Sequence, residues 1–191
     1  MVQAAFKEAK SNHWPFVIHI EFASLSSGAR MHFRRMLDAF LPKHPDHAFV
    51  LIHMAQLEAG PVRELLAKHS NLHFMTSHAS PSYQGGGKPF INMFADGRFK
   101  PEWTKLIADY PDRFIFALDN VFGFFWVPGR YFVKMDLWWR AISALPDRHA
   151  HALAHGNAER LWRLPPKPAS HQTVTPWDSM KKLGQIVGNA R

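Results

Sequence analysis

Four short apolar runs alternate along the chain with segments whose apolar residues recur at helical spacing. The runs cover residues 15–21, 48–54, 71–78 and 113–120 and are rich in Phe, Val, Ile and Leu. Between them, apolar positions three and four residues apart predict helices that pack on a core. Strands that alternate with helices form right-handed β-α-β units around a parallel sheet. The pattern therefore predicts an α/β fold.

Each apolar run leads into a polar side chain. His19 ends the first run, His53 the second, Ser77 and His78 the third, and Asp119 the fourth. The carboxyl ends of parallel strands meet at one edge, where ligands of α/β proteins bind. A single histidine at such a position is more often a hydrogen-bonded core residue. Two histidines and an aspartate at the ends of three of the four strands predict a shared site.

The side chains available at these strand ends suit a metal ion. The chain has no cysteine, which excludes disulfides and thiolate ligands. Neutral imidazoles and a carboxylate are typical zinc ligands in a site that keeps one position open for water. Zinc would lower the pKa of that water and polarise a carbonyl, while a nearby His or Asp moves protons. His19 and Asp119 alone are too few ligands, so we expect little stoichiometric zinc in this chain.

The high positive charge of the chain does not by itself indicate a nucleic-acid partner. The net charge of +8 and the pI near 10.0 would suit nucleic acid, but the longest basic runs are the pairs Arg34-Arg35 and Lys181-Lys182. We therefore expect a solvated basic surface and no nucleic-acid partner. The sequence has no apolar run of 18 residues and no signal-peptide pattern at its start, which predicts a cytoplasmic protein without a membrane partner.

Two irregular segments are expected to contact a small-molecule substrate. Residues 79–100 form a long connection with three glycines before Lys88, but Pro89 follows, so the P-loop spacing is absent. Long loops on a compact scaffold often form the rim of a site. We expect His78, Lys88 and Trp126, the last in an aromatic loop, to bind substrate. The composition changes after residue 166, which predicts a domain over residues 1–166 and a mobile Pro/Ser/Thr tail over 167–191.

The strand ends, taken together, resemble the amidohydrolase superfamily, in particular its amidohydrolase-related branch of metal-dependent hydrolases and decarboxylases. The similar segments are Phe-Val-Ile-His19, Val-Leu-Ile-His53, the strand from Asn71, Pro111-Asp-Arg-Phe-Ile-Phe-Ala-Leu-Asp119, and the closing His155-Gly-Asn-Ala-Glu-Arg-Leu-Trp162. Each motif is modest alone. Their order and spacing make the resemblance fairly specific over roughly residues 1–166.

The resemblance implies a (β/α)8 TIM barrel in which these four strands are the fifth to eighth, so that the chain is a C-terminal half. It implies that His19 is a metal ligand, that His53 is a second ligand or a proton-transfer and substrate-orienting residue, and that Asp119 is a ligand that also handles protons. It also implies a divalent metal, zinc above all, and hydrolysis of a C–N, ester or related carbonyl centre, or a related decarboxylation. The first-strand His-x-His pair of that family has no equivalent here.

A second hypothesis is a catalytically inactive half-barrel or interaction subunit. It would complete its site with a second copy or with an N-terminal half-barrel, and exposed strand edges at both ends would favour such association. Two further expectations concern single residues: Glu21 orients His19 or forms a rim salt bridge with it, and His73 faces the helices. His149, His151 and His155 lie on a short closing helix and are not expected to bind metal.

Overall fold

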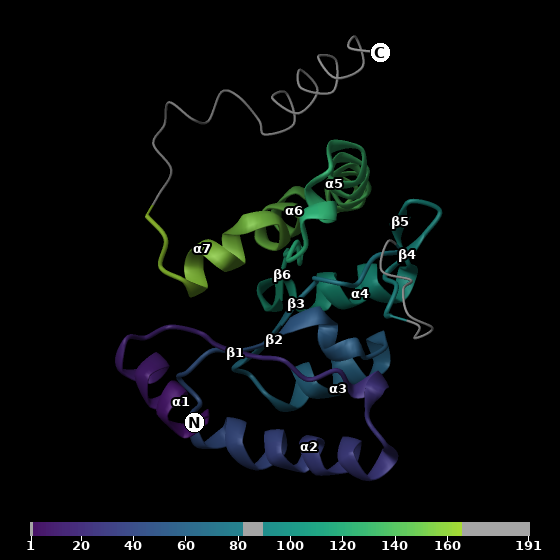
Figure 1. The fold of residues 1–191 in the computed structure, drawn as a ribbon. Helices are drawn as coiled ribbons and strands as arrows, with labels where there is room; N and C mark the ends of the chain where they lie inside the picture. Colours follow the sequence, from purple (N-terminus) through teal and green to yellow (C-terminus); the bar gives the residue numbers. More distant parts are fainter. Residues whose placement is uncertain (1, 82–89, 166–191) are drawn as a thin grey trace.

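The computed structural model describes residues 2–81 and 90–165 and contains one parallel sheet (Figure 1). The sheet order is β1-β2-β3-β6, and the strands are β1 (Phe16–Ile18), β2 (Phe49–Leu51), β3 (Leu72–Met75) and β6 (Phe114–Ile115). Every neighbouring pair is parallel. The predicted α/β fold with a parallel sheet is confirmed, although each strand is shorter than its apolar run.

Helices follow each strand, and their bounds agree with the helical spacing of the sequence. The α-helices are α1 (Val2–Ser11), α2 (Ser27–Phe40), α3 (Ala59–Lys68), α4 (Pro101–Asp109), α5 (Pro128–Ser143), α6 (Asp147–His151) and α7 (Asn157–Leu161). A π-helical turn, Ala152–Gly156, joins α6 to α7. In Figure 1, α1 and α2 lie at the β1 end of the sheet, and α5 to α7 lie at the β6 end.

The two faces of the sheet differ in what they contact. Phe49, Leu51, Phe74 and Phe114 are fully buried and belong to one core with apolar residues of α2, α3 and α4. Side chains alternate between faces along a strand, and the register aligns Val17 and Val50 with His73 on the opposite face. His73 thus lies on the face opposite α2, α3 and α4, in a pocket that it shares with Arg160 and Leu161 of α7 (Asn157–Leu161).

His73 makes stability depend on pH. Burial, together with Arg113, lowers the pKa of His73 from 6.5 to about 4. Below pH 6.5 the unfolded chain therefore binds a proton at this residue that the folded chain does not bind until the pH approaches 4. The contribution of His73 to the free energy of unfolding is fully present above pH 6.5 and is lost as the pH falls toward 4. Urea unfolding at pH 7.5 and 5 should show a loss from this residue of about 2 kcal/mol. In His73→Gln, which keeps a donor for the Phe49 carbonyl, this part of the loss should disappear. The exposed control His32→Gln should leave it unchanged.

The two edges of the sheet are not equivalent. No strand among the described residues pairs with the outer side of β1, where Val17 is 44% exposed. At β6 the closing helices cover the outer side instead: Phe116 N–H donates to the Leu153 carbonyl (3.0 Å), and Asn157 Nδ2 donates to the Phe114 carbonyl (2.8 Å). The expectation of exposed edges holds at β1 and is wrong at β6.

Asn157 is the residue that closes the β6 edge. Its buried amide donates to the carbonyls of Pro111 and Phe114, both at 2.8 Å. In Asn157→Ala these carbonyls would lose their shared donor. We expect the free energy of unfolding to fall by about 2 to 4 kcal/mol. Chemical denaturation measures this. Asn12→Ala, which removes an exposed amide bonded within α1, should change the stability by less than about 0.5 kcal/mol.

A hairpin interrupts the long connection after β3. Strands β4 (Phe94–Ala95) and β5 (Arg98–Phe99) pair antiparallel. Asp96 and Gly97 join them with φ of 50° and 74°, the backbone that an Asp-Gly hairpin turn requires. The predicted tail over residues 167–191 lies outside the described residues, as does Lys88. In the part of the chain that the structure describes, no helix has the length and apolarity needed to cross a membrane.

Candidate metal centre

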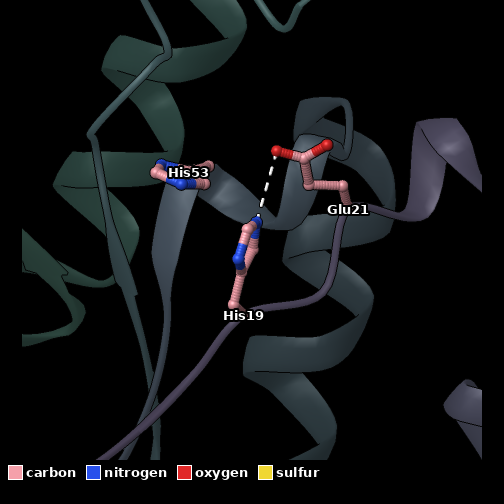
Figure 2. A group of neighbouring side chains, drawn as sticks. All are labelled: His19, Glu21 and His53. Carbon is pink, nitrogen blue, oxygen red and sulfur yellow. Dashed lines mark hydrogen bonds and ion pairs between the residues drawn. The ribbon is translucent and has the colours of Figure 1, made fainter. Parts of the chain in front are cut away.

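His19 and Glu21 form the first part of the site, immediately after β1. Figure 2 shows the His19 ring directed at the Glu21 carboxylate, with His53 beside it from the next strand. His19 Nε2 lies 3.3 Å from Glu21 Oε1, and the His19 and His53 rings meet edge to face with centroids 4.9 Å apart. The expected contact between His19 and Glu21 is therefore present. The strand itself is less buried than predicted, since Phe16 and Ile18 are only partly buried and Val17 is exposed. The His19 side chain that follows it is 58% exposed.

His53 owes its position to an unusual turn after β2. Residues 53–56 all have φ between 52° and 56°, a left-handed conformation that non-glycine residues seldom adopt. Side chains support the turn: Gln56 Nε2 donates to the His53 carbonyl (3.1 Å), and Ile91 N–H donates to Gln56 Oε1 (2.8 Å). Strained backbone of this kind is characteristic of functional sites. Here it places a buried imidazole at the carboxyl edge of the sheet.

Ser77 holds the His53 ring from the end of β3. Its Oγ accepts the His53 backbone N–H at 3.3 Å and lies 2.9 Å from His53 Nδ1. With Nδ1 engaged by this hydroxyl, the other ring nitrogen faces Asp119. Hydrogen bonds of this kind fix which imidazole nitrogen is available for chemistry.

Removing the Ser77 hydroxyl should destabilise the fold. Ser77→Ala leaves two buried polar groups of His53 without their partner, so we expect a loss of about 1 to 3 kcal/mol. Equilibrium urea unfolding measures it. Ser80→Ala is the matched control, because Ser80 is equally buried but its Oγ has no hydrogen-bond partner among the described residues. Its effect should be near zero, and equal losses in both variants would contradict the prediction.

His78 and Asp119 complete the cluster from the ends of β3 and β6. Asp119 Oδ2 lies 3.2 Å from His78 Nε2 and 3.7 Å from His53 Nε2. The two imidazoles stack with centroids 4.0 Å apart and planes 13° from parallel. His78 also has a left-handed backbone, with φ of 60°. Three strand ends thus bring two nitrogens and a carboxylate together.

Burial keeps both stacked imidazoles neutral. It lowers the pKa of His53, and the charge of His19 acts in the same direction against Asp119 and Glu21. Burial and the charge of His53 lower the pKa of His78 to about 4, although Asp119 opposes them. Neutral imidazole is the form that binds a metal or accepts a proton.

Lys134 adds a cation that the sequence analysis missed. It is buried on α5, with Nζ 3.4 Å from Asn120 Oδ1 and 4.5 Å from the centre of the Phe125 ring. Burial lowers the pKa of Lys134, whereas Asp119 raises it. A signal was present in the sequence, because Lys134 shares the apolar helical face of Trp138 and Ala141.

Of the three predicted substrate contacts, the structure describes His78 and Trp126. His78 belongs to the cluster, whereas Trp126 is exposed and donates its Nε1–H to the Asn120 carbonyl at 2.8 Å. A cavity of about 490 Å³ is lined by residues of α2 and α3, among them Arg34 and Glu64, together with Phe22, Gln56 and Phe90. Phe22 follows Glu21, Gln56 ends the His53 turn, and the Phe90 ring is 5.6 Å from His78. None of His19, His53, His78 and Asp119 lines this cavity.

The comparison with known proteins identifies the family of the chain. The sequence model of the amidohydrolase family matches residues 3–164. The chain belongs to this family. No curated protein matches the chain.

Solved structures that resemble the chain include TIM-barrel proteins. One is an uncharacterised TIM-barrel protein of Bordetella bronchiseptica, 16% identical with a TM-score of 0.52, covering 84% of this chain and 49% of that one. Another is an amidohydrolase of Burkholderia multivorans with bound zinc, 17% identical with a TM-score of 0.52, covering 83% of this chain and 55% of that one. The predicted likeness to a TIM-barrel fold is confirmed, whereas the number of βα units stays a prediction. The chain spans about half the length of these proteins.

The donor chemistry of the strand ends fits a divalent metal. The structure brings together two groups of three donors whose ligand atoms lie within 4.8 Å of one another, and His53 belongs to both. One group contains His19 and Glu21, and the other contains His78 and Asp119. The two predicted ligands, His19 and Asp119, thus fall in different groups, and their roles stay predictions. Nitrogen and carboxylate donors in this number suit zinc.

Proposed function

We propose that this amidohydrolase is a metal-dependent hydrolase that acts on a C–N, ester or related carbonyl centre of a small molecule, or catalyses a related decarboxylation. The observation that carries the proposal is the meeting of His53, His78 and Asp119 at the carboxyl ends of three parallel strands, at distances that suit one ion. This is the end of an α/β sheet at which ligands bind. The zinc in the Burkholderia neighbour makes zinc the first metal to test.

The residues around His53 can carry out the proton transfers of such a reaction. A bound divalent metal supplies an acidified water and polarises the substrate carbonyl. Asp119 Oδ2 is positioned to accept a proton, and neutral His53 can orient the substrate or pass that proton to the leaving group. Burial maintains the neutral form of His53.

The experiment compares metal-free and metal-loaded protein. The chain is stripped with a chelator, reloaded with Zn²⁺, Mn²⁺ or Co²⁺, and assayed against lactones, aryl esters, cyclic amides and aromatic carboxylates. Hydrolysis or loss of CO2 that requires the added metal supports the proposal. Turnover at equal rates with and without metal would contradict it.

A second candidate is a half-barrel that is inactive until further strands pair with β1. Two observations favour it: the chain spans about half of its structural neighbours, and among the described residues no strand covers the outer side of β1. In this proposal the chain contributes the fifth to eighth strands, and a second copy or an N-terminal half-barrel contributes the rest. Sedimentation should then show an assembly that Val17→Lys weakens, because an edge lysine opposes strand pairing. A fully active monomer would contradict this candidate.

A further inference from the structure

The pocket beside His73 is a cavity at the opposite end of the sheet from the histidine cluster. Its volume is about 310 Å³. The segments that lead into β2, β3 and β6 line it together with the end of α7, through residues 45–48, 70–71, 73, 112–113 and 160–161. These segments lie at the amino ends of the strands, whereas His53, Ser77 and Asp119 follow the carboxyl ends. The cavity is therefore separate from the candidate metal centre.

Two arginines line this cavity, and neither forms an ion pair among the described residues. Arg113 is partly buried, and its guanidinium group donates to the carbonyls of Leu72 (2.7 Å) and His69 (3.5 Å). The guanidinium group of Arg160 donates to the carbonyl of Asp112 (2.9 Å). Since a guanidinium group carries five N–H donors, both arginines keep donors that these contacts do not use.

The positive charges of the two arginines oppose one another. Burial lowers the pKa of Arg113, and the charge of Arg160 acts in the same direction. Both charges add to the effect of burial on His73, which lines the same cavity. Two acids also line it, but Asp46 and Asp112 are exposed, and neither pairs with an arginine in the part of the chain that the structure describes. An anion in the cavity would therefore reduce a repulsion that the fold compensates only in part.

A buried imidazole adds a further unused group. His47 lines the cavity, and its Nε2 is buried without a hydrogen-bond partner among the described residues. Burial lowers the pKa of His47, and the charges of His44 and Lys10 act in the same direction. The ring is therefore neutral at pH 7 and carries one N–H donor. Buried polar atoms without a partner are rare in folded proteins, and a ligand oxygen would supply the missing acceptor.

We propose that this cavity binds a phosphate group, either inorganic phosphate or the phosphate of a small ester, through Arg113, Arg160 and His47. A phosphate monoester carries a charge of about −1.5 to −2 at pH 7, which matches two arginines. Guanidinium groups bind phosphate oxygens through paired N–H donors. A cavity of this volume is in the range that holds a small ligand, so it leaves room for an organic group beside the phosphate. The site needs no metal and is independent of the function proposed above.

Bound phosphate would connect three segments of the chain. His47 precedes β2, Arg113 precedes β6, and Arg160 lies on α7. A ligand that binds only the folded chain raises the midpoint of thermal unfolding with its concentration. Phosphate should do so, whereas chloride at equal ionic strength should not. Phosphate should also raise the pKa of His73 in NMR titrations, because it offsets the charges of Arg113 and Arg160.

The test is calorimetric titration of the metal-free full chain with inorganic phosphate and with phenyl phosphate, at an ionic strength of about 0.15 M. We expect one phosphate per chain. Arg160→Gln should weaken binding by more than about 10-fold, the loss of a charge-assisted hydrogen bond. Arg35→Gln is the matched control, because it makes the same change in charge on an exposed part of α2 that does not line the cavity. It should weaken binding by less than about 2-fold, since salt screens distant charges.

A second variant leaves every arginine contact in place. Ser70 is exposed on a turn of the lining, and Asp is well tolerated in turns. Ser70→Asp adds a negative charge beside the proposed anion, so it should weaken binding by more than about 3-fold. Circular dichroism confirms that each variant is folded.

The two titrants separate the two sources of phosphate. Equal affinities would assign the site to the phosphate group alone, and tighter binding of phenyl phosphate would assign it to an ester; both results support the inference. Equal losses in Arg160→Gln and Arg35→Gln would overturn it, because phosphate would then bind the basic surface in general. Binding that occurs only after addition of Zn²⁺ would also overturn it, since the phosphate would then lie at the metal centre.

Discussion

Asp119→Asn is expected to lower kcat/KM of the metal-dependent reaction by about 10²- to 10⁴-fold, the range that a positioned proton acceptor contributes. The substitution keeps the size of the side chain but removes the negative charge that faces His53 Nε2 and His78 Nε2. An amide cannot take a proton from water, and it binds a divalent ion more weakly than a carboxylate does. The measurement is steady-state turnover at saturating metal, with any substrate that the wild-type chain hydrolyses.

Glu21→Gln is the matched control, because it makes the same chemical change in the other donor group. Glu21 contacts only the exposed side of the site through His19, so its loss should change turnover by less than about 10-fold, the low end of the effect of outer partners. Turnover within tenfold of wild type in Asp119→Asn would contradict the assignment of Asp119. A larger loss in Glu21→Gln than in Asp119→Asn would move the chemistry to the His19 side.

The sequence pattern was sufficient to locate the strand ends. Apolar runs of parallel strands are continuous, because both faces are buried, so the polar residue that ends each run is visible without a structure. This is why His19, His53 and Asp119 could be selected from a chain with 13 histidines. The family resemblance depended on the same residues. The Asp-Gly pair at residues 96–97 is also typical of a hairpin turn, and the structure places it between β4 and β5.

The structure was needed wherever the backbone departs from local preference. Nothing in residues 53–56 or at His78 favours left-handed conformations, and tertiary hydrogen bonds to Ser77 and Ile91 impose the first of them. The pairing of His78 with Asp119 depends on this geometry. The covered edge of β6 likewise depends on a contact between Asn157 and a strand more than 40 residues earlier. Contacts of this range are set by packing, which a hydrophobic pattern does not reveal.

Trp138 joins the parts of the fold that follow β3. It is fully buried on α5 and contacts Phe94, Phe99 and Phe116, with ring centroids 4.8, 5.9 and 5.3 Å away. These rings belong to the β4–β5 hairpin and to the segment between β6 and Asp119. The indole therefore packs against the segment that positions the Asp119 carboxylate.

Trp138→Ala should lower the free energy of unfolding by about 3 to 5 kcal/mol, the cost of a cavity left by a large buried aromatic residue. Aromatic pairs contribute beyond the area that they bury, so Trp138→Phe should recover part of the loss. Chemical denaturation followed by circular dichroism measures both variants. Trp14→Ala, which removes an indole that is 57% exposed, should cost less than about 1 kcal/mol. A loss in Trp138→Ala no greater than in Trp14→Ala would show that the hairpin, α5 and the strand-end segment do not share one core.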